Sequence, residues 1–366
     1  MKFLRYKQYM IGLLALSLFA SCDFEKINTN EFEMLPEEGK MDGISVGGPI
    51  TALQKCVVPV GTQDDGTNVA NEYQVAYHLA ADCWSGYFAQ NNNWNSGRNN
   101  LTYFLMDGWV SASYTSAYTK VIPLWQDIKI KTEKDFPEAY ALAQILKVST
   151  WHKATDMFGP IPYKEAGKGL ISVPYDSQAD VYKYMFEDLT NAIGVLTNAL
   201  EHGTTKLLPN ADAVYGGNVK KWIVYANSLM LRLAMRVYYA DEAMSKKYVL
   251  QAVNNPYGVM QSKGDEAKME KGAGLTFINN IEILSNQYNE CRMGSSMQAY
   301  LGGYEDPRLP KYFTESEAYF AKKVGQYGSY MAVPTGNIAS QNDVFKMASR
   351  PNAVSYTHLR AHETLR

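Results

Sequence analysis

The sequence is poor in the residues that would mark several common classes of protein. It holds four cysteines and five histidines among 366 residues, and its formal net charge is −2. A nearly neutral chain lacks the basic surface by which proteins bind nucleic acid, so no nucleic-acid partner is expected. The few cysteines and histidines show no regular metal-ligand spacing, and no cofactor or metal is predicted.

The sequence also lacks an apolar run long enough to cross a membrane. Residues 10–20 supply about half of the roughly 20 apolar residues that a spanning helix requires. This stretch follows a segment with Lys2, Arg5 and Lys7, and the chain turns polar at Asp23. A basic start, a short apolar run and a small-residue exit are typical of a secretory signal peptide, which we predict at residues 1–21.

The residues FASC, at positions 19–22, resemble the lipobox of bacterial lipoproteins. The resemblance implies cleavage before Cys22 and acylation of this cysteine. Each buried methylene of an acyl chain contributes about 0.8 kcal/mol, so several chains anchor a protein firmly. Asp23 and Glu25 resemble the export signal of surface lipoproteins in Bacteroidota. We therefore expect a protein anchored in the outer membrane and exposed at the cell surface, with residues 22–45 as a lipidated tether.

Apolar residues recur at three- and four-residue steps through most of the chain, which predicts a mainly helical, all-α fold. No strand-rich block appears. The pairing of residues 111–131 with 138–157, and of 178–200 with 219–240, suggests a tetratricopeptide-like helical repeat scaffold with irregular loops, without a strict repeat consensus. Pro123 is expected to kink or break the second of the predicted helices. Helices are expected at 71–89, 108–131, 137–158, 177–200, 219–240, 244–253 and 295–300.

The final residues, 354–366, fit nothing upstream in pattern or composition. They resemble a translated sequencing adapter, and we interpret them as a non-native tail. His358 and His362 have the spacing of two metal ligands on one helical face, but they belong to this tail, so no metal site is predicted there. Residues 46–353 are then expected to form one helical domain that is incomplete at its C-terminus.

Three internal segments carry the most specific patterns. These are ATDMFGPIPYKEA at 154–166, VKKWIVYANSLMLRLAMRV at 219–237 and YEDPRLPKYF at 304–313. Together with the lipobox they resemble the SusD/RagB family, in its SusD-like branch. The resemblance implies a nutrient-binding lipoprotein, not an enzyme. Such proteins capture oligosaccharides, or sometimes peptides, as the lid of a SusC-like TonB-dependent transporter.

The polar residues in these three segments are expected to hold the fold together. Asp156 lies in the last turn of a helix, the unfavourable end for its charge, so we expect it to bind nearby backbone or an arginine. Asn227 and Arg232 are expected to bind buried loop backbone. Asp306 is expected to cap a turn, with Arg308 as its ion-pair partner.

Side chains suited to carbohydrate binding gather at residues 90–104. An indole can stack on a sugar ring, while amides and a guanidinium bind hydroxyls. Loops on a rigid scaffold commonly carry binding residues. The candidate ligand-binding residues are Asn92, Asn93, Trp94, Asn95 and Arg98. Alternatively, Trp94 fills the scaffold. Trp84 and Tyr87, on the preceding helix, are expected in the core.

Other arrangements of functional residues are less complete. Asp64, Asp65, Asn68 and Glu72 offer oxygen ligands without the full spacing of a calcium loop. His152 and Asp156 have the spacing of a base and its orienting acid, but no nucleophile accompanies them, which favours a structural histidine. One disulfide among Cys56, Cys83 and Cys291 or free buried thiols remain alternatives. A glycoside hydrolase would need a carboxylate pair that the sequence does not place, and a helical-repeat adaptor stays possible.

Overall fold

The computed structural model describes residues 44–59, 72–269, 271–272, 275–276, 279–317, 329–336 and 343–352. The predicted signal peptide, Cys22, the tether before residue 44 and the tail at 354–366 lie outside these ranges. Asp64, Asp65 and Asn68 of the calcium candidate also lie outside them. Among the described residues, every helix is too short or too polar to cross a bilayer.

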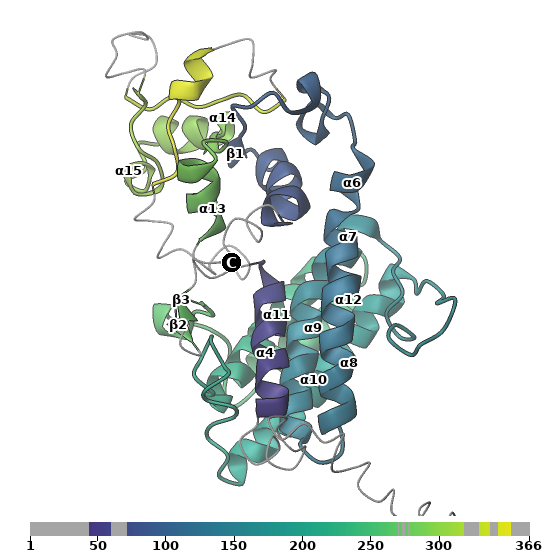
Figure 1. The fold of residues 1–366 in the computed structure, drawn as a ribbon. Coiled ribbons are helices and arrows are strands. Elements are labelled where there is room, and N and C mark those ends of the chain that lie inside the picture. The colour runs from purple at the N-terminus through teal and green to yellow at the C-terminus, as the bar shows by residue number, and fades with distance from the viewer. Residues whose placement is uncertain are drawn as a thin grey trace, which may run out of the picture. The chain divides into compact units, whose positions relative to one another are not determined.

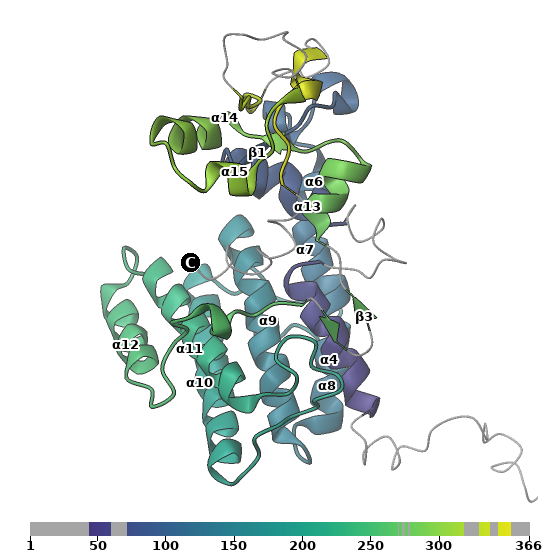
Figure 2. The ribbon, with the colours of Figure 1, turned by 90° about the vertical axis from the view of Figure 1, so that its left-hand side faces the viewer.

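Most of the described chain forms an array of packed helices, which confirms the mainly helical prediction. Successive helices lie side by side from α8 to α12 (Figures 1 and 2). Residues 133–136 join α8 to α9, a length typical of a helical hairpin. The helices are α4 (Ile44–Val57), α8 (Ile122–Thr132), α9 (Pro137–Phe158), α10 (Gln178–Glu201), α11 (Val219–Arg236) and α12 (Glu242–Val253).

Local sequence signals set the ends of the longest helices. Pro137 occupies the first turn of α9, where the missing N–H costs nothing. Gly159 ends α9 at φ +73°, a conformation open to glycine and strained for other residues. The Ser177 hydroxyl caps α10 by accepting a hydrogen bond from the N–H of Asp180 at 3.1 Å. The prolines, glycines and caps of the sequence therefore determine these boundaries.

The expected helix at 108–131 is divided into several pieces. The chain forms α6 (Asp107–Val110), α7 (Ala112–Ser116) and a π-helical turn at Ala117–Val121 before α8. Pro123 lies in the first turn of α8. Since proline cannot donate the helical hydrogen bond, the preceding turn widens and the helix restarts at this point.

The helical array encloses one large hydrophobic core. The apolar residues that recur at three- and four-residue steps form one stripe on α10 and one on α11, and both stripes face this core. Trp151 on α9 is fully buried within it. Leu200, the last member of the α10 stripe, is half-buried at the edge. The fully enclosed members of the two stripes are Val181, Met185, Leu189, Ile193 and Leu196 on α10, and Trp222, Ala226, Leu229 and Leu233 on α11.

A second hydrophobic cluster joins two segments that are far apart in the sequence. Strand β1 (Phe88–Ala89) pairs antiparallel with β4 (Arg292–Met293), with Phe88 opposite Met293. β2 (Lys271–Gly272) and β3 (Leu275–Thr276) form another short antiparallel pair. The helical turns from the later segment are α13 (Asn280–Glu282), a π-helical turn at Ile283–Gln287, α14 (Ser295–Met297), a π-helical turn at Gln298–Gly302 and α15 (Leu309–Tyr312).

The cysteines in the described residues are free thiols. Cys83 and Cys291 are buried in the second cluster, whereas Cys56 is half-buried on α4. Of the two alternatives left by the sequence, the structure therefore shows free thiols.

The polar residues of the three family-like segments have mostly the expected structural roles. Asn227 donates from Nδ2 to the carbonyl oxygen of Gly258 at 2.9 Å, and Arg308 binds Asp306 through its guanidinium at 2.6 Å. Arg232 differs from the expectation: its Nη1 is buried without a hydrogen-bond partner among the described residues. The loop that binds Asn227 reaches that side chain but not the arginine one helical turn further on.

Candidate functional site

The amide-rich loop at residues 90–104 has an ordered internal framework. It contains two short 3₁₀ turns, Trp94–Gly97 and Asn100–Thr102. Asn99 is fully buried between them and caps the second turn with its side-chain oxygen. Its Nδ2 donates to the carbonyl oxygen of Trp94 at 2.9 Å. One buried amide thus fixes both turns.

The same loop holds three residues other than glycine in the left-handed region. Asn95, Ser96 and Tyr103 have φ values of +52°, +53° and +58°. Such conformations cost of order 1–3 kcal/mol each and are concentrated at ligand-binding and active sites. Here the surrounding hydrogen bonds maintain them, including one from the Thr102 hydroxyl to the carbonyl oxygen of Gly97 at 2.7 Å.

A distant segment ties the start of the loop in place. Asn91 donates from Nδ2 to the carbonyl oxygen of Asn289 at 2.9 Å, and Asn92 donates from Nδ2 to Glu290 Oε1 at 2.6 Å. Gln74 binds the other oxygen of Glu290 at 2.8 Å. These contacts join segments about two hundred positions apart, so they could not be read from local sequence patterns.

The structure places the candidate ligand-binding residues in two environments. Asn92, Asn95 and Arg98 are exposed, whereas Asn93 and Trp94 are half-buried. Asn95 uses its amide to bind the carbonyl oxygen of Arg98 at 2.7 Å. The indole of Trp94 packs edge-on against Trp109, with ring centroids 6.1 Å apart, at the border of the second cluster. Trp94 therefore packs against the scaffold and keeps part of its surface accessible.

Two aromatic residues expected in the core lie at the surface. Trp84 and Tyr87 are 41% and 48% exposed. The segment before them is a π-helix at Gln74–Asp82, whose wider turn changes which side chains share a face. The helix ends at Trp84, and Gly86 at φ +77° turns the chain toward β1, so Tyr87 lies in the bend before that strand and not on a helix. A period of 3.6 residues therefore assigned Trp84 to the wrong side, and the expected helix at 71–89 extended too far to place Tyr87.

Trp84 forms an exposed aromatic pair with Tyr103, which was not among the candidate ligand-binding residues. Its ring lies nearly parallel to that of Tyr103, at 12° and with centroids 6.4 Å apart. Its Nε1 donates to the carbonyl oxygen of Asn100 at 3.0 Å, which fixes the indole against the amide-rich loop. Tyr103 is 77% exposed, and Phe104 and Leu105 after it are exposed as well. A run of three apolar residues in a polar loop was the sequence signal that could have pointed to this exposed aromatic surface.

The loop also concentrates buried polar atoms that lack partners. Among the described residues, Gln90 Oε1, Asn91 Oδ1, Asn93 Oδ1 and Asn100 Nδ2 are buried without a hydrogen bond. Buried polar atoms are nearly always paired, with protein or with ordered water. Ordered water is the usual partner of such atoms, so these side chains belong to the internal framework of the loop.

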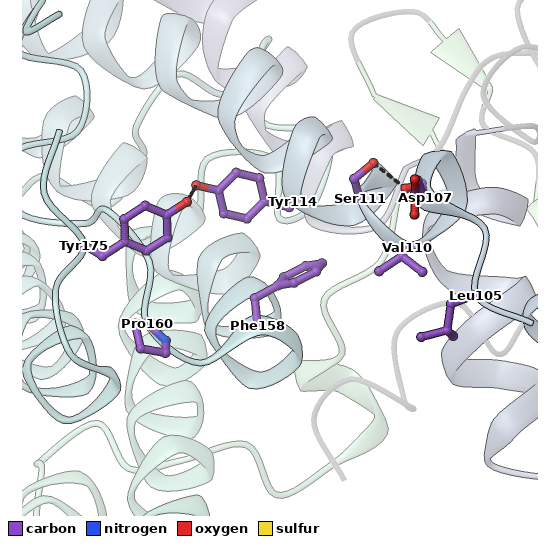
Figure 3. A pocket seen from close by; sticks show the side chains of 8 residues that line it. All are labelled: Leu105, Asp107, Val110, Ser111, Tyr114, Phe158, Pro160 and Tyr175. Carbon is purple, nitrogen blue, oxygen red and sulfur yellow. Dashed lines mark hydrogen bonds between the residues drawn. The ribbon is translucent and has the colours of Figure 1, made fainter. Parts of the chain in front are cut away.

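Leu105, the last residue of this exposed run, lines a pocket of about 550 Å³. Leu105, Val110, Phe158 and Pro160 form its apolar walls, and its polar lining consists of Asp107, Ser111, Tyr114 and Tyr175. Figure 3 shows the two phenol rings meeting at their hydroxyls on one side of the pocket, with Asp107 and Ser111 on the other. The helix α7 and the segment after α9 supply the phenols.

The phenols of Tyr114 and Tyr175 meet at their hydroxyl groups. Their oxygens lie 3.4 Å apart. Burial and the hydrogen bond with Tyr175 raise the pKa of Tyr114 to about 12, so its hydroxyl stays protonated at neutral pH. Tyr114 also stacks on Tyr118, with ring centroids 4.4 Å apart, and meets the edge of Phe158. The pocket wall on this side is therefore fixed by aromatic packing.

Two further candidates have structural explanations. His152 is buried and donates from Nδ1 to the carbonyl oxygen of Val148 at 3.1 Å, as a structural histidine would. Glu72, from the calcium candidate, accepts a hydrogen bond from Ser116 at 2.6 Å and pairs with Lys120. In the part of the chain that the structure describes, no three metal-binding side chains gather at one point.

Comparisons with known proteins identify relatives of this chain. The model of the SusD-like family, described as SusD and RagB outer membrane lipoprotein, matches residues 26–364. No curated protein matches the chain. The solved structure of BT1043 shares 32% identity and a TM-score of 0.75, with 84% of this chain and 61% of that protein covered.

Two further structures resemble the chain to a similar degree. A chitin-binding SusD homologue from Flavobacterium johnsoniae shares 31% identity and a TM-score of 0.76, covering 86% of this chain and 62% of its own. A SusD homologue from Bacteroides vulgatus shares 26% identity and a TM-score of 0.77, covering 88% and 63%. The chain thus spans about three fifths of the length of these relatives. By its family-model match, its identity to these structures and its shared fold, the chain belongs to the SusD-like family of SusD and RagB outer membrane lipoproteins.

Proposed function

We propose that this protein is a cell-surface lipoprotein that captures oligosaccharide for import through a SusC-like TonB-dependent transporter. The observation that carries the proposal is the exposed Trp84–Tyr103 pair beside the amide-rich loop. A sugar ring presents an apolar C–H face and a rim of hydroxyls, so it suits flat aromatic rings next to amides. The chitin-binding homologue among the similar structures supports the same class of ligand.

The proposed binding surface includes the residues selected from the sequence. Trp84 and Tyr103 offer the stacking faces, and the partly accessible Trp94 borders them. The exposed amides and guanidinium would bind sugar hydroxyls. The proposed ligand contacts from the loop are Asn92, Asn93, Trp94, Asn95 and Arg98.

We propose binding without chemical conversion. Glycoside hydrolysis ordinarily requires two carboxylates on opposite sides of the scissile bond. In the part of the chain that the structure describes, Asp107 is the one carboxylate that lines the pocket. The family resemblance supports the same conclusion, since SusD-like proteins capture ligands for a transporter.

The proposed route to the membrane is a lipid anchor. Signal peptidase would remove residues 1–21, and acylated Cys22 with the tether to residue 45 would attach the domain at 46–353 to the outer membrane. The proposed transporter partner can be tested by purifying the lipoprotein from native membranes. Co-purification of a large TonB-dependent barrel is expected, and its consistent absence from mild-detergent preparations would contradict the partnership.

Ligand capture can be tested by calorimetric titration of the full chain with a panel of oligosaccharides, beginning with chitohexaose. Saturable binding without released sugar is expected. Loss of one stacking ring costs about 0.5–1.5 kcal/mol, so Trp84→Ala should weaken binding about threefold to tenfold. The matched control is Tyr239→Ala, at a 97% exposed aromatic residue beyond α11.

Each alternative function predicts a different result in this experiment. Binding of short peptides instead of any sugar would favour the peptide-capturing lid. Release of free sugar that disappears on a carboxylate-to-amide substitution would favour an enzyme. Equal affinities of the Trp84→Ala variant and the unmodified chain would overturn the assignment of this surface.

A further inference from the structure

The pocket lined by Leu105 does not include the Trp84–Tyr103 pair, but the two sites are neighbours in the sequence. Tyr103, Phe104 and Leu105 are consecutive exposed residues, and the last of them lines the pocket. Two residues of fully extended chain span at most about 7 Å, so a ligand stacked near Tyr103 can extend one unit into the pocket.

We propose that this pocket holds one sugar unit of the captured glycan and selects a unit without an acidic group. The inference rests on the proposed function, since it concerns the same glycan. It adds a second contact region and a restriction on substrate class.

The chemistry of the lining fits a sugar ring. Apolar side chains, among them Phe158 and Pro160, form walls against which a C–H face can pack. Polar groups stand on two sides, with the phenols of Tyr114 and Tyr175 on one and Asp107 on the other (Figure 3). A hydroxyl-bearing ring between them can donate to the carboxylate and exchange hydrogen bonds with the phenols. An entirely apolar ligand would leave these groups unpaired, which is unfavourable.

The charge of the pocket lining is the reason to expect a sugar unit without an acidic group. Asp107 is the one charged side chain among the described residues of the lining, and it is negative. Asp176 follows Tyr175, and its carboxylate contributes, after burial and the neighbouring phenols, to the raised pKa of Tyr118. Among the described residues that line the pocket there is no lysine or arginine to pair with an anion. A uronic acid or a sulfated sugar would bring a second negative charge next to Asp107, and like charges disfavour such binding.

Several residues of the pocket can be changed without disturbing the core. Tyr175 is 65% exposed, and its hydroxyl meets that of Tyr114. Asp107 is exposed and accepts the Ser111 hydroxyl with its backbone carbonyl oxygen, not with its carboxylate. Tyr175→Phe and Asp107→Asn therefore remove single functional groups and should leave folding unchanged.

The test uses the full chain and pairs of oligosaccharides that differ only in charge: oligogalacturonides with their carboxyl-reduced forms, and sulfated chito-oligosaccharides with their desulfated forms. The neutral member of a bound pair should bind about twofold to fivefold more tightly than the acidic one, because two unit charges about 4 Å apart interact by about 1 kcal/mol at an exposed site. Asp107→Asn should narrow this difference, and Tyr175→Phe should weaken the neutral ligand about threefold to tenfold. Tyr239→Phe is the matched control and should change neither quantity.

The outcomes separate this inference from the function on which it rests. If the unmodified chain binds no oligosaccharide, the proposed function fails and the inference fails with it. If glycan binds and Trp84→Ala weakens it, while Tyr175→Phe and Asp107→Asn change nothing, the pocket inference alone is overturned. Equal affinity for the acidic and neutral members, or displacement of glycan from the pocket by a lysine-containing peptide, would also overturn it.

Discussion

The carboxylate of Asp156 binds the guanidinium of Arg236, with Oδ2 and Nε 2.9 Å apart. The other oxygen of Asp156 accepts the Tyr182 hydroxyl at 2.5 Å. One carboxylate in the last turn of α9 therefore joins α9 to both α10 and α11. This explains why an acidic residue occupies the helix end that is electrostatically unfavourable for it.

Asp156→Asn should lower the free energy of unfolding by about 1 kcal/mol, because it removes an ion pair that is half-exposed at Arg236 and keeps an acceptor for Tyr182. Denaturant unfolding followed by circular dichroism measures the change. Asp127→Asn is the control, since it breaks an exposed pair with Lys131 within one helix. An equal effect of both substitutions would show that the bond between helices adds nothing.

Asp212→Asn should be more damaging, with a loss of about 3 kcal/mol in the free energy of unfolding, because its buried carboxylate organises a loop against two helices. Trp222→Phe removes one donor and part of a buried indole, and should cost about 2 kcal/mol. If the tryptophan variant proved the less stable, the carboxylate would not be the organising group. Its donors are Gln54 Nε2, the N–H groups of Val214, Tyr215 and Gly217, and Trp222 Nε1.

Stability should fall as the pH drops below about 6.5, owing to His152. Burial, followed by the nearby charge of Lys153, lowers the pKa of His152 from 6.5 to about 3 in the folded chain. Arg232 and Arg236 act in the same direction. Between these two pH values the unfolded chain binds a proton that the folded chain does not, so this residue contributes a slope of up to about 1.4 kcal/mol per pH unit.

His152→Asn retains a side-chain donor for the Val148 carbonyl and removes the titrating ring. The slope of unfolding free energy against pH between 6 and 4 should therefore be smaller in this variant than in the unmodified protein. The same substitution at the exposed His202 controls for the loss of a histidine. Parallel slopes in the His152 variant and the unmodified chain would contradict the assignment.

Cys22→Ala should abolish lipid attachment in the native host. Metabolic labelling with a palmitate analogue should mark the unmodified protein and not the variant, and the variant should leave the membrane fraction. Cys56→Ala is the control, since this thiol lies on α4 within the folded domain. Continued labelling of the Cys22 variant would contradict its predicted acylation.

Local signals were sufficient for the scaffold. The bounds of α9 follow from Pro137 and Gly159, and α10 begins at its Ser177 cap, because these effects act over a few bonds. The apolar stripes of α10 and α11 follow from helical periodicity, since each helix buries one continuous face.

The surface of the candidate site depended on contacts that no local pattern contains. The π-helix at Gln74–Asp82 brought Trp84 to the surface against the helical expectation. Glu290 anchors a loop 198 positions earlier in the chain. Arg232, whose Nη1 is buried without a hydrogen-bond partner among the described residues, departs from expectation for the same reason: whether a loop carbonyl reaches a side chain depends on the path of another segment.

The sequence by itself determined the helical class, the family and the expected place of anchorage, because periodicity, caps and short motifs act within a few turns of the chain. Only the tertiary structure decided which aromatic rings are available to a ligand and which carboxylate faces the pocket. Exposure is a property of what packs on a residue, and for Trp84, Tyr103 and Asp107 it is set by a widened helix and by the folding of a loop on itself.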